Sequence, residues 1–461
     1  MNKYLALLIA ALYGIDIDAQ TLKPAPRLVV NIAIDQLRTD YLEHFAPLYG
    51  TDGFRKLLTE GCVYEAAGYP FSPVDRASAI AAIATGTTPR YNGIAGTKWL
   101  DRNTLHPVHC TDDSKHVASP ARMTTSTIGD ELKISTGGAA VVYSVAANED
   151  AAILSAGHAA DGAFWLTDTP LRWTTSSYYG DTALKWIKAY NSTQKQISGN
   201  EAIIALAEKC VSTYVMGRDN TPDLLSVTLS ANGITETNQK GTESSNTIPS
   251  DWQTDLLPVY TTLDRQLATL ISNIEQAFGR EQVLFILTGT GYTDEPPTDY
   301  ARYRVPTGTF HIDRTANLLN MYLVAVYGQG RYVEACAGNQ IYLNRKLIED
   351  RHITLAEVVS RSKDFLTQSA GVRSVSESPN SPAVSGDLIV EVTPGWQLVN
   401  DETGEQYTSR AAFIPFPIIV YGAGTQPRRV TTPVSVCQIA PTIARAIRIR
   451  APNACADAPL P

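Results

Sequence analysis

The chain has little cysteine, a modest share of charged side chains and no long apolar run, and each shortage excludes a class of protein. Six cysteines in 461 residues are too few to replace a hydrophobic core, so a disulfide scaffold is excluded. Charged residues make up 18% of the sequence, the net charge is −8 and Lys and Arg form no cluster, so we expect no nucleic-acid partner. No stretch has the roughly 18 consecutive apolar residues of a transmembrane helix. The 44% of hydrophobic residues instead predict a globular protein with an ample core.

Residues 1–19 have the pattern of a signal peptide. A short basic start precedes the apolar run "YLALLIAALYG", which is too short to span a bilayer, and the segment ends at Ala19. We therefore expect residues 20–461 to form the mature chain and to be periplasmic or secreted. Export permits a disulfide between Cys437 and Cys455, and free buried thiols are the equal alternative.

Five apolar runs are typical of buried strands, and segments with helical periodicity separate them. Strands that alternate with helices predict an α/β fold: a three-layer sandwich whose mostly parallel sheet carries helices on both faces. Residues 297–395 interrupt this alternation and predict a small inserted subdomain. The runs are 27–37, 139–147, 223–230, 282–289 and 417–422, and the clearest helical segment is 261–278.

One loop has the form of a segment that carries a catalytic nucleophile to the start of a helix. It reads "GYPFSPVDRASAIAAIATGTTP" and covers residues 68–89. Arg76 stands at the junction of loop and helix, where an attacking hydroxyl would be most useful. The hydroxyl groups of Ser72, Ser78 and Thr85 lie elsewhere in the segment.

The chain resembles the alkaline phosphatase superfamily, and within it the exported phosphate monoesterases related to the nucleotide pyrophosphatase/phosphodiesterase group. The resemblance runs in order along nearly the whole mature chain and implies the α/β sandwich fold. The segments that carry it are "VNIAIDQLRTDYL", "GFRKLLTEG", "ATGTTPRYNGIAGTKWLDR", "SPARMTTSTIGDELK", "AAILSAGHAADGAFWLTD", "PDLLSVTLS" and "YVEACAGNQIYLN".

The same resemblance implies a two-zinc phosphatase site, and this chain departs from it at most positions. Members hold two zinc ions with three Asp and three His, and a Thr or Ser attacks phosphorus while the metals clamp the attacking and leaving oxygens. Asp35 matches the first ligand, whereas Arg76 occupies the nucleophile position. The other five ligand positions fall on Asn232, Glu236, Thr290, Gly291 and Pro415.

Residues that hold the phosphate in the superfamily have changed as well. The expected Asn is Thr97, and an expected Lys and Arg fall on Asn148 and Asp150. We therefore expect that the chain kept the superfamily fold but lost the zinc ligands. The zinc cofactor and the phosphatase chemistry would have been lost with them.

Asp35, left at a partly buried strand end, needs a charge partner. Arg76 could supply it as an ion pair across the former metal site, and a solvent-facing Arg76 is the alternative. Asn232 and Glu236 could provide a weak oxygen site for Ca²⁺ or Mg²⁺. Of the histidines, "HPVH" (His106 and His109) has a spacing that could suit a metal, although Pro107 and the turn-like context favour a turn, and His158 is expected to be structural.

Three functions remain open from the sequence. The favoured one is a catalytically inactive binding or scaffolding subunit, with a protein partner in the cell envelope. The second is a metal-dependent hydrolase of phosphate mono- or diesters, with Ser72, Ser78 or Thr85 as relocated nucleophile and a metal near Asp35. The third is a pocket that binds a small molecule through Asp35, Arg76 and Thr97 without turnover.

Overall fold

The computed structural model describes residues 24–461, apart from 168–170, 194–198, 233–251, 295–299, 301–302, 381–382, 409 and 413. The predicted signal peptide and Glu236 lie outside the described residues. In the described part of the chain, no helix has the length and apolar character that crossing a membrane requires.

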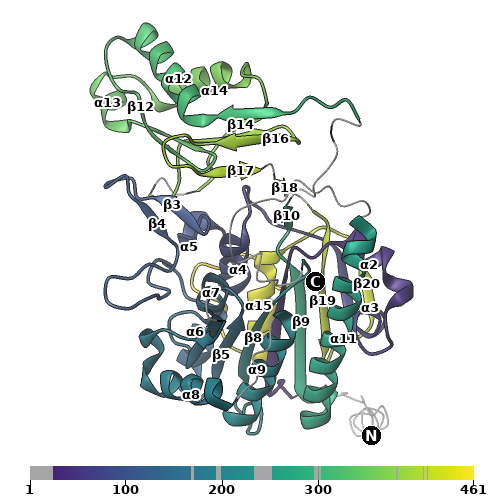
Figure 1. Ribbon diagram of the computed structural model, residues 1–461. Helices are drawn as coiled ribbons and strands as arrows, with labels where there is room; N and C mark the ends of the chain where they lie inside the picture. Colours follow the sequence, from purple (N-terminus) through teal and green to yellow (C-terminus); the bar gives the residue numbers. More distant parts are fainter. Residues whose placement is uncertain are drawn as a thin grey trace, which may run out of the picture.

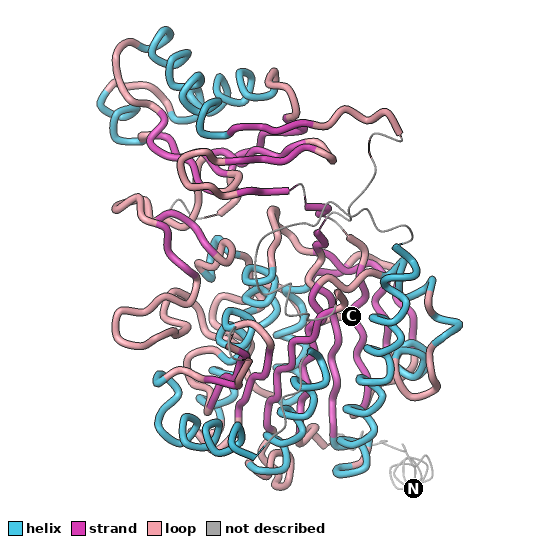
Figure 2. Tube along the Cα trace, viewed as in Figure 1, coloured by secondary structure: helices cyan, strands magenta, loops and turns pink. Residues whose placement is uncertain are grey.

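A central sheet of ten strands organises the larger part of the molecule, as Figure 2 shows in magenta. Its core strands are parallel and completely buried, because each is a nearly continuous apolar run with helices on both faces. The strand order is β20 (Arg428–Val430), β2 (Cys62–Gly68), β19 (Phe416–Gly422), β9 (Val283–Gly289), β1 (Leu28–Asp35), β8 (Asp223–Ser230), β5 (Val142–Ala146), β6 (Gly162–Leu166) and β7 (Trp173–Thr174), with β21 (Val434–Ser435) beside β2.

Two groups of helices cover the opposite faces of this sheet (Figure 1). In each group the helices pack against one another as well as against the strands. One group contains α3 (Phe54–Glu60), α9 (Gly199–Thr213) and α11 (Trp252–Phe278), and the other α4 (Arg76–Thr85), α6 (Ile128–Ser135), α7 (Glu149–Ala156) and α15 (Ile439–Ile447). The α/β sandwich expected from the sequence is confirmed.

One strand runs against the expected direction. The apolar run 417–422 was expected to resemble the parallel core strands, but β19 is antiparallel to both of its neighbours, β2 and β9. An apolar run indicates burial and says nothing about strand direction, which depends on the path of the preceding chain.

A second, smaller core lies above the carboxyl ends of the parallel strands (Figure 1). It is built from residues between Phe310 and Leu398, which overlap the inserted range 297–395. Its helices are α12 (Ile312–Tyr327), α13 (Arg345–Asp350) and α14 (Leu355–Thr367). Its strands are β11 (Gly308–His311), β12 (Val333–Ala337), β13 (Gln340–Leu343), β14 (Val372–Glu377), β15 (Leu388–Val392), β16 (Trp396–Val399) and β17 (Gln406–Thr408).

A hairpin of the main domain anchors this subdomain. Strands β3 (Lys98–Leu100) and β4 (Pro107–His109) form the hairpin, and Arg102 lies in its turn. The Arg102 guanidinium donates to the backbone oxygens of Leu343 and Ser385 and to the carboxylate of Asp387. The subdomain is therefore held over the edge of the sheet where the sequence places its candidate site.

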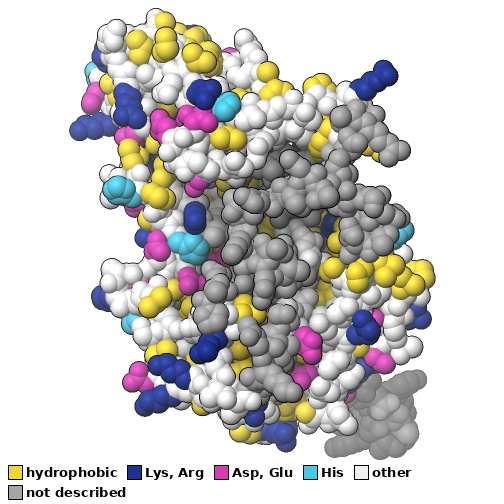
Figure 3. Space-filling model, in the orientation of Figure 1, with side chains coloured by type: hydrophobic (Ala, Val, Ile, Leu, Met, Phe, Trp, Pro, Cys, Tyr) yellow, Lys and Arg dark blue, Asp and Glu magenta, His cyan; other side chains and the backbone are white. Residues whose placement is uncertain are grey.

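Basic side chains form no single patch on the face shown in Figure 3. Lys and Arg are scattered there among acidic and neutral side chains. This distribution offers no continuous positive track for a nucleic-acid backbone.

Candidate functional site

Asp35 lies at the carboxyl end of β1, where ligands of open α/β sheets bind. Its side chain is largely buried, and one carboxylate oxygen, Oδ1, accepts a hydrogen bond of 2.9 Å from the hydroxyl of Thr290 at the end of β9. The other oxygen, Oδ2, lies 3.9 Å from Nη1 of Arg76. Both oxygens of Asp35, the residue that the resemblance matches to a zinc ligand, therefore have partners within the protein.

Arg76 is the first residue of α4, and its guanidinium points toward two carboxylates. Nη2 lies 3.0 Å from Oδ2 of Asp150, and Nε donates to both oxygens of that carboxylate at 3.1 and 3.2 Å. Asp150 is itself only 2% exposed. The ion pair of Arg76 with Asp35 is thus present, the solvent-facing alternative is wrong, and Asp150 is the nearer partner.

Electrostatics keep Arg76 charged in this position. Burial alone would lower the pKa of the guanidinium, but the negative charges of Asp150 and then Asp35 outweigh burial and raise the pKa. The N-terminus of a helix disfavours a cation. The two carboxylates offset that cost, and Asp150 gains further because it lies in the first turn of α7.

Asp75 holds in place the segment 68–89, here called the nucleophile-type loop. Asp75 is not among the site residues predicted from the sequence. Its carboxylate accepts hydrogen bonds from the backbone N–H of Ser78, which caps α4, and from the backbone N–H and hydroxyl of Thr97. Thr97 also lies 3.5 Å from Oδ2 of Asp150 through its hydroxyl. The pattern Asp-x-x-Ser at 75–78 was a visible helix-capping motif that could have identified this residue.

Two of the three hydroxyl groups that the sequence suggests as relocated nucleophiles make structural hydrogen bonds instead. Ser78 is fully buried in the capping box with Asp75. Thr85 is fully buried and donates to the backbone oxygen of Ala81 at 2.6 Å. Ser72 alone of the three is partly exposed.

The end of β8 carries Asn232, which the structure places beside Gln36. The Asn232 amide donates to the side-chain oxygen of Gln36, which also accepts from Thr293 at 3.3 Å. Gln36 has a left-handed backbone (φ 61°), and its N–H donates to the hydroxyl of Thr290 at 2.9 Å. No sequence pattern indicates Gln36, because a positive φ at a residue other than glycine has no local motif.

Gly291 and Pro415 lie in a mostly apolar part of the candidate site. A side chain at Gly291 would meet the ring of Tyr69 at 2.5 Å and that of Phe416 at 2.9 Å, and Gly291 has a positive φ of 70°. Together with Pro415 these residues line a mostly apolar pocket. An imidazole or carboxylate ligand cannot be accommodated at position 291 with the surrounding side chains in place.

The residues present do not fit the pair of zinc ions that the resemblance implies. In the part of the chain that the structure describes, no group of three or more His, Cys, Asp or Glu side chains is arranged to hold a metal ion. Asp35, the single matching ligand, is paired with a guanidinium. The structure therefore supports no step that passes through a metal at this place.

The other sequence candidates have structural surroundings. His109 bonds the hydroxyl of Thr111 through Nδ1 at 2.7 Å, within the β3–β4 hairpin. Both ring nitrogens of His158 are bonded, to Asp130 and to the backbone oxygen of Met123, each at 3.0 Å. Cys437 and Cys455 are free thiols.

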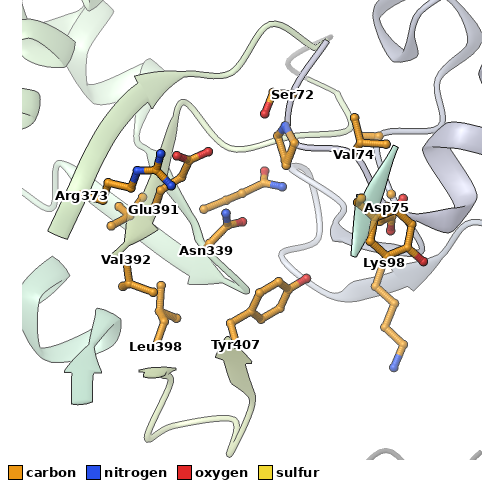
Figure 4. A pocket seen from close by; sticks show the side chains of 16 residues that line it. Ser72, Val74, Asp75, Lys98, Asn339, Arg373, Glu391, Val392, Leu398 and Tyr407 are labelled. Carbon is orange, nitrogen blue, oxygen red and sulfur yellow. The ribbon is translucent and has the colours of Figure 1, made fainter. Parts of the chain in front are cut away.

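A cleft opens beside the loop that precedes α4, between the main domain and the subdomain. It encloses about 860 Å³ of space not filled by atoms, part of it open to solvent. Ser72 and Asp75 line it from the nucleophile-type loop, and Asn339, Glu391 and Tyr407 line it from the subdomain (Figure 4). Asn148 lies outside the residues that line this cleft.

Comparisons with known proteins agree with the fold. A family model described as type I phosphodiesterase / nucleotide pyrophosphatase matches residues 29–412. A protein named calcium-transporting ATPase from Myroides odoratus is 26% identical to this chain, and the alignment covers 93% of each of the two sequences. Alkaline phosphatase PafA from Elizabethkingia meningoseptica is 24% identical over 95% of this chain and 94% of its own. The crystal structure of wild-type PafA superposes with a TM-score of 0.78 at 22% identity, over 95% of this chain and 98% of that one.

Proposed function

Because the chain belongs to the type I phosphodiesterase / nucleotide pyrophosphatase family, we propose that it is a member that binds a ligand or partner without hydrolysing phosphate esters. The observation that carries this proposal is the Arg76 guanidinium. It occupies the nucleophile position and lies 3.0 Å from Asp150 and 3.9 Å from Asp35.

A guanidinium at this position fails two requirements of the family's chemistry. It carries no hydroxyl that could attack phosphorus. It also places a fixed positive charge about 4 Å from the only matching ligand, where repulsion would oppose a divalent cation. The chemistry needs ligand groups at five further positions, and four of them are the uncharged residues Asn232, Thr290, Gly291 and Pro415.

Turnover assays on the full chain test this proposal. Purified protein would be incubated with 4-nitrophenyl phosphate and bis-4-nitrophenyl phosphate, with and without added zinc, and alkaline phosphatase PafA would serve as the positive control. We expect hydrolysis at the level of a no-enzyme blank in each case. Zinc-dependent turnover that is lost in Asp35→Asn would overturn the proposal.

A second candidate function is a hydrolase with relocated catalytic residues. The relatives favour it, because several are named alkaline phosphatases. Ser72 is the hydroxyl that this function would use, since it lines the cleft and is partly exposed. Activity that is lost in Ser72→Ala and kept in Ser78→Ala would establish this candidate in place of the first.

The binding role that we propose is extracytoplasmic, with a protein of the cell envelope as partner. The apolar N-terminal run and the preserved packing around an altered site motivate it. Capture with a tagged chain from the native envelope fraction tests it, with an unrelated exported protein bearing the same tag as control. A partner enriched over this control is expected, and an identical set of captured proteins would count against the role.

A further inference from the structure

The cleft between the two domains has side chains that the proposed function leaves unassigned. Its lower wall is the loop from Ser72 to Asp75, and its upper wall is the subdomain sheet. In Figure 4 Asn339 and Tyr407 point from the subdomain toward the centre of the cleft, and Arg373 lies beside Glu391 on one wall. These groups are brought together from segments about 300 residues apart in sequence.

The charge of the cleft does not suit an anion such as a phosphate ester. Lys98 and Arg373 are balanced by Asp75 and Glu391 among the lining residues. The neighbouring charge cluster has two carboxylates, those of Asp35 and Asp150, and one guanidinium, that of Arg76. Phosphate recognition ordinarily relies on an excess of positive charge.

The polar side chains of the cleft match a neutral ligand rich in hydroxyl groups. A side-chain amide such as that of Asn339 both donates and accepts hydrogen bonds, and a carboxylate such as that of Glu391 accepts two. Neighbouring hydroxyl groups of a sugar satisfy such pairs. The apolar face of a sugar ring packs on an aromatic ring, and Tyr407 is 38% exposed at the rim.

We propose that this cleft binds a neutral saccharide. The inference rests on the proposed non-hydrolytic function, because a phosphatase would bind a phosphate ester in the same cleft. The main domain contributes polar groups of the nucleophile-type loop, and the subdomain contributes Asn339, Glu391 and Tyr407.

Binding measurements on the full chain test the proposal. A microarray of neutral oligosaccharides would be screened, and the best probe would be titrated by calorimetry alongside inorganic phosphate and AMP. Asn339→Ala and Tyr407→Ala should each weaken saccharide binding about tenfold, the loss expected of one hydrogen bond or ring contact. Tyr91→Ala, which removes an exposed tyrosine outside the cleft, is the matched control and should bind normally.

The outcomes separate this inference from the proposed function. Binding of phosphate or AMP in preference to every saccharide, or no binding by any probe, would overturn the saccharide site. So would saccharide binding that Asn339→Ala and Tyr407→Ala leave unchanged. In each case a blank in the turnover assays would still support the non-hydrolytic function, and zinc-dependent turnover would refute that function whatever the saccharides do.

Discussion

The guanidinium of Arg76 and the carboxylates of Asp35 and Asp150 form a charge cluster whose members depend on one another. Asp150 is 2% exposed and Asp35 7%, so each carboxylate would be costly to bury without a cation. The Arg76 side chain is a quarter exposed, which moderates the strength of the pairing. The cluster joins two positions at which the resemblance implies other residues: Asp150 stands where a cation is expected, and it is the nearer partner of Arg76.

Removal of Arg76 should therefore destabilise the protein. Arg76→Met removes the cation from two carboxylates, and we expect the free energy of unfolding to fall by about 2–4 kcal/mol. This is at or below the usual cost of breaking a buried ion pair, because Arg76 is partly exposed. Urea denaturation at neutral pH measures it. The double variant Arg76→Met/Asp150→Asn should recover part of the loss, and a single-variant loss below about 0.5 kcal/mol would contradict the pairing.

The His158–Asp130 pair should give stability a defined pH dependence. The hydrogen bond to Asp130 raises the pKa of His158 above its ordinary 6.5, although burial opposes it. Burial would raise the pKa of Asp130, but the hydrogen bonds from His158 and the backbone hold it below 3.8. The imidazolium's contribution is complete below pH 6.5 and is lost as the pH rises through the raised pKa, whereas the carboxylate's is lost as the pH falls through the lowered one.

His158→Gln measures this dependence. The difference in the free energy of unfolding between the natural chain and the variant should be larger at pH 5 than at pH 9. Urea denaturation at both pH values provides the comparison. A difference that is independent of pH would show that His158 is not charged in the folded protein.

At the scale of elements, the loop before α4 is fixed by capping and by a contact across the site. Asp75 caps α4 and also binds the backbone and side chain of Thr97, so one carboxylate positions two segments. The helix then ends at Gly86, whose φ of 65° is the left-handed conformation that glycine adopts without strain. The conformation of the nucleophile-type loop and the ends of α4 are therefore maintained by Asp75, Thr97 and Gly86.

Asp75→Ala should uncouple these segments. We expect a loss of about 1–2 kcal/mol in the free energy of unfolding, from the helix cap and the bonds to Thr97. Asp75→Asn, which keeps an acceptor for the cap, is the milder comparison and should lose less. Equal losses in the two variants would show that the amide oxygen of Asn does not replace the carboxylate as acceptor, and no loss in Asp75→Ala would contradict the role of Asp75.

The sequence predicted the elements of the site better than their contacts. Asp35 at the end of a buried strand and Arg76 at the start of a helix follow from apolar runs and the loop pattern. The bond from Thr290 to Asp35 joins residues 255 positions apart, and no local pattern encodes it. The same holds for Arg76 with Asp150, which the sequence indicated only as two separate changes. The position of Gly291 against Tyr69 depended on side-chain packing that only the folded chain shows.

Across the whole molecule, the β3–β4 hairpin bonds the subdomain through the Arg102 guanidinium and through the N–H of Leu100, which donates to the hydroxyl of Tyr342 at 3.2 Å. Arg102 and Arg345 bind opposite oxygens of Asp387, which is 5% exposed, with Arg102 reaching across from the main domain. Arg102 also caps two backbone oxygens of the subdomain. The position of the upper wall of the cleft therefore depends on this contact.

Arg102→Met should loosen the subdomain. Hydrogen exchange followed by mass spectrometry should show faster exchange in the β3–β4 hairpin and around residues 340–344, with the central sheet unchanged. The free energy of unfolding should fall by about 2–3 kcal/mol, the scale of lost bonds to a charged group. Arg345→Met, which removes a bond within the subdomain, is the control and should leave exchange in the hairpin unchanged.

Calorimetric titration of zinc into the purified full chain tests most directly whether the chain lacks a two-zinc site. With Asp35 held by Arg76 and Thr290, we predict that the natural chain and Asp35→Asn give the same zinc isotherm. Two equivalents of tightly bound zinc in the natural chain, lost in Asp35→Asn, would contradict the account.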